Sequence, residues 1–229
     1  MKKIIGVIQA RIGSTRLPYK MMLSLHGKPL IEWVIKRVQK SQLLDDIIVA
    51  IPISEDNDIL AKYIEELNVK IYRGSESNVL NRFYESVKEE NATQIVRICA
   101  DNPLIDGNEI DNLINFYNNN KCDYAYNHIP KNNLYPDGLG AEIISFKTIE
   151  NLNNIVDTQH HKEHCLSYIA DNSKKYIIKT FDPIAKELHY PELRFDVDTF
   201  DDYHKLCMKD FDIDISSKEL IKLFTKKTI

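Results

Sequence analysis

Short apolar runs and segments with apolar residues at helical spacing alternate along the first hundred positions of the chain. The apolar runs predict strands, at residues 4–10, 47–53, 69–72 and 94–100. Between them, apolar residues three or four positions apart predict helices, over 29–40, 59–67 and 79–87. We expect Pro29 in the first turn of one helix and Asp56 as the cap of the next. Such alternation is typical of an α/β fold in which helices wrap a parallel sheet.

This regular alternation stops after a helix expected near residues 109–117. The stretch 128–138 is polar and contains Pro130 and Pro136. Around and beyond it the pattern predicts strands and helices in a different order: strands at 123–127 and 139–145, a helix at 160–172, strands at 176–181 and 194–198, and a helix from about 201. We therefore expect one domain over residues 1–229 with a small mixed α/β insertion at approximately 128–190.

The composition is globular and slightly acidic. The chain has 30 Lys and Arg against 34 Asp and Glu, a net charge of −4, so a general nucleic-acid surface is not expected, although a local cationic pocket is compatible with it. No apolar run approaches the roughly 20 residues that cross a bilayer, so no membrane partner is expected. The four cysteines include no Cys-x-x-Cys pair, which favours free thiols and a cytoplasmic location.

The loop after the first predicted strand is rich in cations and hydroxyls. In an open parallel sheet, ligands gather at the carboxyl ends of the strands, where this loop begins. Its residues could wrap a polyphosphate through a flexible backbone at Gly13, hydroxyls at Ser14 and Thr15, and cations at Arg11, Arg16 and Lys20. The glycine spacing fits neither the dinucleotide fingerprint nor a P-loop. A solvated loop with scattered charges is the alternative interpretation.

Two groups of carboxylates follow later strands. Asp101 comes at the end of the strand at 94–100 and could ligate Mg²⁺ together with phosphate oxygens, or could open a turn with Asn102 and Pro103. Asp196 and Asp198 would share one face of a strand and could point at the same cation. Alternatively, Asp198 caps the helix that follows.

The motif Gln-Ala-Arg-x-Gly-Ser-Thr-Arg-Leu-Pro-x-Lys at 9–20 resembles the nucleotide-binding signature of the sugar-acid cytidylyltransferases. Asp-x-Pro-Leu-Ile at 101–105 is similar to the family's second signature, although Ala100 stands where relatives usually carry Gly. The best match is the branch of the spore coat polysaccharide biosynthesis protein F. The resemblance implies a Rossmann-like, mostly parallel sheet of the nucleotide-diphospho-sugar transferase type. It also implies CMP transfer from CTP to an acidic sugar, with release of pyrophosphate, for surface polysaccharide synthesis.

The resemblance further implies roles for individual residues. Mg²⁺ is expected on Asp101 and Asp198, with Asp196 ranked second to Asp198. Lys20, Arg11 and Arg16 are the predicted catalytic residues. Arg97 could form a structural ion pair or contact a phosphate. Arg82 could contact the nucleotide or lie solvated on its helix. The predicted nucleotide-binding set is Gln9, Ala10, Arg11, Gly13, Ser14, Arg16, Lys20, Arg73, Ser75, Arg82 and Arg97.

The acceptor side of the site is less well determined. The segment Pro-Asp-Gly-Leu at 136–139 resembles an acceptor-pocket segment of the family, and we expect Asp137, Glu142 and His164 to bind the acceptor. Gly140 stands where relatives often have Asp, so the acceptor stays open among a 2-keto sugar acid, a sugar phosphate and a phosphonate. Relatives use the insertion for acceptor binding and dimer contacts, which implies a homodimer.

Three alternatives stay open. A metal-dependent glycosyltransferase would also use an Asp-x-Asp motif, which Asp196 and Asp198 superficially match, although their place near the C-terminus argues against it. A non-catalytic nucleotide-binding module would bind CTP without turnover. The run from His160 to His164 suggests zinc, but it lacks the His-Glu-x-x-His order of zinc proteases.

Overall fold

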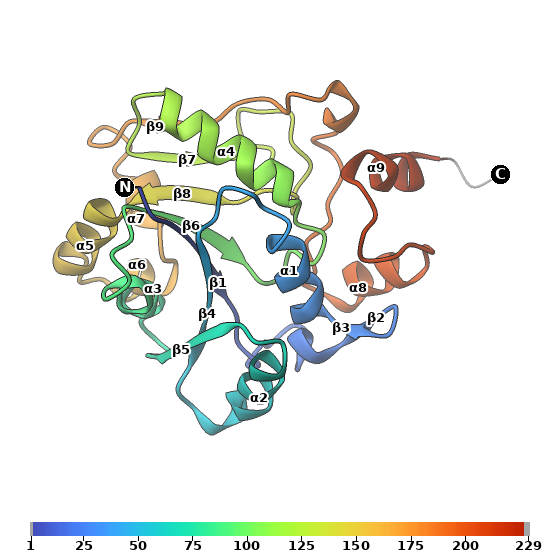
Figure 1. Cartoon of the computed structure of the whole chain (residues 1–229), viewed down its shortest axis with the longest axis horizontal. Coiled ribbons are helices and arrows are strands. Elements are labelled where there is room, and N and C mark those ends of the chain that lie inside the picture. Colours follow the sequence, from blue (N-terminus) through green and yellow to red (C-terminus); the bar gives the residue numbers. More distant parts are fainter. Residues whose placement is uncertain (1, 227–229) are drawn as a thin grey trace.

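The computed structural model describes residues 2–226 and shows a central sheet with helices on both faces (Figure 1). Within these residues the sheet has seven strands in the order β5-β4-β1-β6-β8-β7-β9, and β8 alone runs antiparallel to its neighbours. The prediction of a mostly parallel α/β sheet is thus confirmed. The strands are β1 (Ile4–Gln9), β4 (Asp46–Pro52), β5 (Lys70–Gly74), β6 (Gln94–Cys99), β7 (Tyr124–Tyr126), β8 (Glu142–Ser145) and β9 (Ile178–Lys179).

Two hydrophobic cores form because successive side chains of each strand point to opposite faces. In β1, Ile4 and Ile8 pack into one core, and Ile5 and Val7 into the other. The first core lies under α1 (Leu30–Val38), α2 (Asp58–Glu66) and α4 (Gly107–Asn119). The second lies under α3 (Val79–Val87), α5 (Phe146–Ile155) and α7 (Ser167–Asp171), which gather with α6 (Gln159–Glu163) on the other side of the sheet in Figure 1.

A third core joins the C-terminal helices to the N-terminal half. Helices α8 (Phe200–Cys207) and α9 (Ser217–Thr225) pack beside α1 and the hairpin of β2 (Ser24–Leu25) and β3 (Lys28–Pro29). Trp33 is buried in this core, with its ring centroid 5.6 Å from that of Phe211. This packing brings the extended segment before α8 to the carboxyl end of the sheet. Short 3₁₀ helices are η1 (Lys20–Met22), η2 (Glu55–Asn57) and η3 (Lys186–Leu188).

Several predicted elements differ in detail. The helix expected over 160–172 is two short helices, because His164 leaves the helical conformation (ψ 69°) and ends α6 three residues before α7 begins. Residues 194–198 are extended but join no sheet apart from one bridge between Asp137 and Arg194. Pro29 immediately precedes α1 rather than lying in its first turn.

The predicted cap of α2 is also wrong. Asp56 lies in η2, and the residue before the helix is Asn57, whose side chain makes no capping bond. The Asn57 amide oxygen instead accepts from the backbone N–H of Ile12 at 2.9 Å. The residue that precedes α2 therefore holds the loop after β1.

The stretch 128–190, expected as an insertion, contributes β8 and β9 to the same central sheet. Its role in acceptor binding and dimer contacts stays a prediction. Within residues 2–226, no helix combines the length and apolar character needed to cross a bilayer.

Candidate active site

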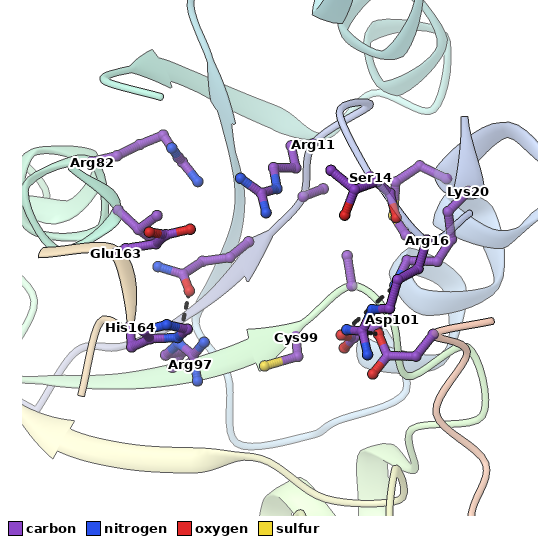
Figure 2. A pocket seen from close by; sticks show the side chains of 17 residues that line it. Arg11, Ser14, Arg16, Lys20, Arg82, Arg97, Cys99, Asp101, Glu163 and His164 are labelled. Carbon is purple, nitrogen blue, oxygen red and sulfur yellow. Dashed lines mark hydrogen bonds and ion pairs between the residues drawn. The ribbon is translucent and has the colours of Figure 1, made fainter. Parts of the chain in front are cut away.

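A cavity of about 300 Å³ lies at the carboxyl ends of β1 and β6, bounded by α3 and α6 (Figure 2). The structure brings eleven of the predicted site residues to it: Gln9, Ala10, Arg11, Ser14, Arg16, Lys20, Arg82, Arg97, Asp101, His164 and Asp198. The predicted residues that do not line it are Gly13, Arg73, Ser75, Asp137, Glu142 and Asp196.

The loop between β1 and η1 is held by hydrogen bonds within it, although Arg11, Thr15 and Arg16 are exposed. The Ser14 N–H donates to the Ile12 carbonyl at 2.8 Å, and the Ser14 hydroxyl accepts from the Leu17 N–H at 3.3 Å. Tyr19 then takes a left-handed conformation (φ 56°), after which the chain turns inward and buries Lys20. A Cβ added at Gly13 would meet only the Glu76 carboxylate, at 3.7 Å.

Lys20 lies between two carboxylates that come from distant parts of the chain. Its ammonium is 3.3 Å from Asp198 Oδ1 and 3.9 Å from Asp101 Oδ2, and it donates to the Val197 carbonyl at 2.6 Å. The guanidinium of Arg16 reaches Asp198 Oδ1 at 3.0 Å from the solvent side. The Val197 N–H donates to the Asp101 carbonyl at 2.8 Å, which fixes the C-terminal segment against the end of β6. Cations and carboxylates therefore converge at one end of the cavity.

Negative charge accumulates around Asp101. Burial raises the pKa of Asp101, Lys20 opposes the shift, and Asp198 adds to it. Burial also raises the pKa of Asp137 to about 6, and the charges of Asp196, Asp101 and Asp198 contribute. Carboxylate oxygens are the ligands that Mg²⁺ prefers in proteins, so Asp101 and Asp198 could hold this ion.

Asp196 is oriented differently from Asp198. Its carboxylate accepts two hydrogen bonds from Arg194, at 3.0 and 2.5 Å. The same guanidinium lies 3.9 Å from Asp137. Asp196 and Asp137 thus belong to a cluster around Arg194 beside the cavity.

Arg97 and Glu142 form a pair at the other end of the cavity. The Arg97 Nε donates to Gln9 Oε1 at 2.7 Å, and its Nη1 donates to Glu142 Oε2. Glu142 Oε1 accepts from the Tyr124 hydroxyl at 2.5 Å. Burial raises the pKa of Glu142, but Arg97, His128 and Tyr124 outweigh burial and hold the pKa below its ordinary value. Glu142 is therefore an ionised, buried partner of Arg97.

Arg82 and Arg73 differ in their access to the cavity. Arg82 is buried, donates to the Ser75 carbonyl, and has its pKa lowered to about 10 by burial. Arg73 instead donates to the carbonyls of Ile53 and Ser54, each at 3.1 Å, and pairs with Asp58. The Ser75 hydroxyl accepts from the N–H of Asn78, the residue before α3, at 3.0 Å. Arg73 and Ser75 thus bind neighbouring protein groups.

Other lining residues were not predicted. Arg97, Cys99 and Asp101 alternate along β6 and its end, so the two-residue period of a strand already indicated Cys99. Glu163 lines the cavity beside His164 and carried no signal of its own. Ligand atoms of His160, His161 and Asp171 lie within 4.8 Å of one another, but His161 Nδ1 is already 2.9 Å from the Ser167 hydroxyl.

Comparison with known proteins identifies the family of the chain. The sequence model described as "Cytidylyltransferase" matches residues 5–227. The chain belongs to the cytidylyltransferase family. It is accordingly a nucleotidyltransferase, and the resemblance seen in its sequence is confirmed.

Relatives in sequence cover most of the chain. An uncharacterised protein of Methanocaldococcus jannaschii is 34% identical over 98% of this chain and 91% of its own length. The spore coat polysaccharide biosynthesis protein SpsF of Bacillus subtilis is 28% identical over 99% of this chain and 95% of its own length. A 3-deoxy-manno-octulosonate cytidylyltransferase of Bdellovibrio bacteriovorus is 36% identical over 54% of this chain and 49% of its own length.

Solved structures share the fold. A cytidylyltransferase of Leptospira borgpetersenii superposes with a TM-score of 0.87 at 25% identity, covering 100% of this chain and 99% of its own. A CMP:2-keto-3-deoxy-manno-octonic acid synthetase, solved with CTP, superposes with a TM-score of 0.68 at 18% identity, covering 90% and 97%. These superpositions confirm the predicted fold class, a mostly parallel α/β sheet with flanking helices.

Proposed function

We propose that this cytidylyltransferase transfers CMP from CTP to an acidic sugar and releases pyrophosphate. The observation that carries the proposal is the convergence of Lys20 with Asp101 and Asp198 in a cavity that Arg11 and Arg16 also line. Cations offset the charge of a triphosphate, and carboxylates hold the divalent cation that accompanies it. The names of the family and of its sugar-acid relatives support the nucleotide and the acceptor class.

The reaction is an in-line displacement at the α-phosphorus of CTP. An acceptor oxygen forms a new bond to this phosphorus while the bond to the bridging oxygen of pyrophosphate breaks. Arg11 and Arg16 bind phosphate oxygens and stabilise the negative charge that develops on pyrophosphate, and Lys20 neutralises charge at the α-phosphate. Gln9, Ala10, Ser14 and Arg82, which also line the cavity, complete the nucleotide site in this proposal.

Mg²⁺ is the proposed cofactor. Asp101 and Asp198 would hold it, because both residues line the same cavity and Lys20 brings their carboxylates to one point. When bound, the ion polarises the α-phosphate and offsets its charge. Asp196 is a weaker candidate because Arg194 binds both of its carboxylate oxygens and it does not line the cavity, whereas the ion pairs of Asp198, which lines it, involve Oδ1.

The proposal also covers the oligomeric state, the acceptor-binding residues, the pathway and the location of the protein. We propose a homodimer in which residues 128–190 supply dimer contacts and bind the acceptor through Asp137 and His164. Surface polysaccharide synthesis and a cytoplasmic location complete the proposal. The SpsF relative, whose name refers to spore coat polysaccharide, supports the pathway.

A pyrophosphate-release screen tests the function. Four nucleoside triphosphates are each incubated with Mg²⁺ and a panel of acidic sugars, sugar phosphates and phosphonates. Pyrophosphate released with CTP and an acidic sugar is the expected result. Free CDP or UDP from a sugar nucleotide would instead indicate glycosyl transfer, and CTP binding without pyrophosphate would indicate a non-catalytic module.

A further inference from the structure

Arg97 presents a guanidinium to the cavity that the protein saturates only in part. Its Nε donates to Gln9 and its Nη1 donates to Glu142. Arg97 lines the cavity, and 19% of its side chain is exposed. The guanidinium fork carries five N–H donors, so donors are left for a ligand.

Glu142 is unable to meet a ligand directly. It does not line the cavity, its side chain is 6% exposed, and its two oxygens accept from Tyr124 and Arg97. Its charge stabilises the Arg97 cation, and its position between two donors fixes the direction of the guanidinium. Any influence of Glu142 on a ligand therefore passes through Arg97.

The Arg97 end of the cavity is distinct from the triphosphate end. Arg97 lies within β6, whereas Asp101 lies four residues later, in the turn that follows the strand. Figure 2 shows Lys20, Arg16 and Asp101 on one side, Arg97 and His164 on the other, and Cys99 between them. Arg97 also reaches across to β8, away from the loop after β1.

The free nitrogen of Arg97 marks this end of the cavity as a place for an anionic oxygen. Within residues 2–226, its Nη2 donates to no protein group, because Gln9 and Glu142 accept from Nε and Nη1. Gln9 Nε2 and Arg82 Nε also have no hydrogen-bond partner among the described residues, but both atoms are covered by protein and do not face the cavity directly. A negatively charged ligand oxygen can therefore accept from Arg97 Nη2, beside the carboxylate of Glu163, which lines the same end.

We infer that Arg97 is a specificity-determining residue that binds the carboxylate of the acceptor, and that Glu142 is a positioning residue that orients it. A planar carboxylate matches the guanidinium fork, which a neutral group does not. This inference rests on the proposed function. It moves Arg97 from the nucleotide site, where the sequence placed it, to the acceptor site.

The test compares an acidic sugar with its carboxamide. The best acid from the pyrophosphate-release screen is assayed beside its C1 carboxamide, with wild type and the double variant Arg97→Met/Glu142→Gln. The double variant removes both charges, so it leaves no unpaired buried charge. Glu142→Gln alone and Arg97→Lys report on orientation, and Lys28→Met/Glu32→Gln is a matched control at an ion pair of 3.1 Å that does not line the cavity.

Wild type and the control are expected to prefer the acid roughly 10- to 100-fold in kcat/KM, on the scale of one charged hydrogen bond. In the double variant this preference falls to within about threefold, while the KM for CTP changes by less than about threefold. Glu142→Gln and Arg97→Lys raise the KM for the acid about tenfold with little change in that for CTP.

The remaining outcomes overturn the inference. A double variant that keeps the acid preference, or that loses affinity for CTP, shows that Arg97 serves another group, while the proposed function stands. Equal use of acid and carboxamide by wild type also shows that Arg97 does not select a carboxylate. If wild type releases no pyrophosphate with any pair in the screen, the proposed function fails and the inference with it.

Discussion

The Lys20 ammonium lies 3.3 Å from Asp198 Oδ1, although 178 positions separate the two residues in sequence. The contact depends on two features of the fold. The loop after β1 turns inward at Tyr19, and the third core brings the C-terminal segment to the carboxyl end of β6. The site is therefore assembled by the whole chain.

Replacing Lys20 tests its role in stabilising charge. Lys20→Met removes the cation from a buried site beside two carboxylates, so we expect kcat to fall by about 10²-fold or more, on the scale of one lost electrostatic contact. Steady-state pyrophosphate release measures the effect, and thermal unfolding verifies that the variant is folded. Wild-type kcat in a folded variant would exclude this role.

Exchange of single carboxylates distinguishes the proposed metal ligands from their neighbour. Asp101→Asn and Asp198→Asn should each lower kcat by roughly 10²-fold or more, since an amide binds Mg²⁺ less well than a carboxylate. Asp196→Asn should have a much smaller effect, because its carboxylate pairs with Arg194. Titration of activity with Mg²⁺ measures the difference. An Asp196 variant as impaired as the other two would place Asp196 on the metal.

Asp137 makes stability depend on pH. Its pKa of about 6 lies above the ordinary 3.8, so the folded state binds the proton more tightly than the unfolded state does. This contribution to stability is complete below pH 3.8 and is lost as pH rises to 6. Without divalent cations, Asp137→Asn should therefore gain in Tm relative to wild type between pH 4 and pH 7.5. A pH-independent difference between the two melting temperatures would contradict the raised pKa.

Arg37 is expected to be critical for stability. It is buried and donates to the carbonyls of Ile105, Ile213 and Ile215 at 2.7 to 2.9 Å, which ties α1 to the segment before α9. Arg37→Met removes the guanidinium from these carbonyls, of which Ile213 keeps a second donor in Lys40 at 3.3 Å, and should lower the free energy of unfolding by about 3 kcal/mol or more. Urea denaturation measures the loss. An unchanged unfolding midpoint would show that water replaces the guanidinium without penalty.

Much of the fold could be predicted because its signals are local. The apolar runs of β1, β4 and β6 and the helical spacing in α1 and α3 reflect burial on a sheet, which periodicity reports directly. The split between α6 and α7 could not be predicted this way, because Cys165 and Leu166 between them are buried in the second core, most of whose members lie far away in sequence. Helix α9 was also missed, although the capping box of Ser216 and Glu219 and the apolar residues that follow it were local signals of a helix.

The candidate site likewise has residues that local sequence signals identified and arrangements that depend on tertiary packing. The motif after β1 and the carboxylate after β6 identified residues that line the cavity at the end where Lys20 lies. The different orientations of Asp196 and Asp198, by contrast, depend on Arg194 and on a segment that is extended without joining a sheet. The burial of Glu142 behind Arg97 likewise follows from the pairing of β6 with β8. Tertiary pairing of this kind leaves no trace in local spacing.

A crystal structure of the protein with CTP and Mn²⁺ tests the central claim most directly, because anomalous scattering locates the metal. We expect a metal peak within about 2.5 Å of carboxylate oxygens of both Asp101 and Asp198, with the triphosphate contacting Lys20 and Arg16. CTP bound with its phosphates outside this cavity, or a metal that neither carboxylate contacts, would contradict the account.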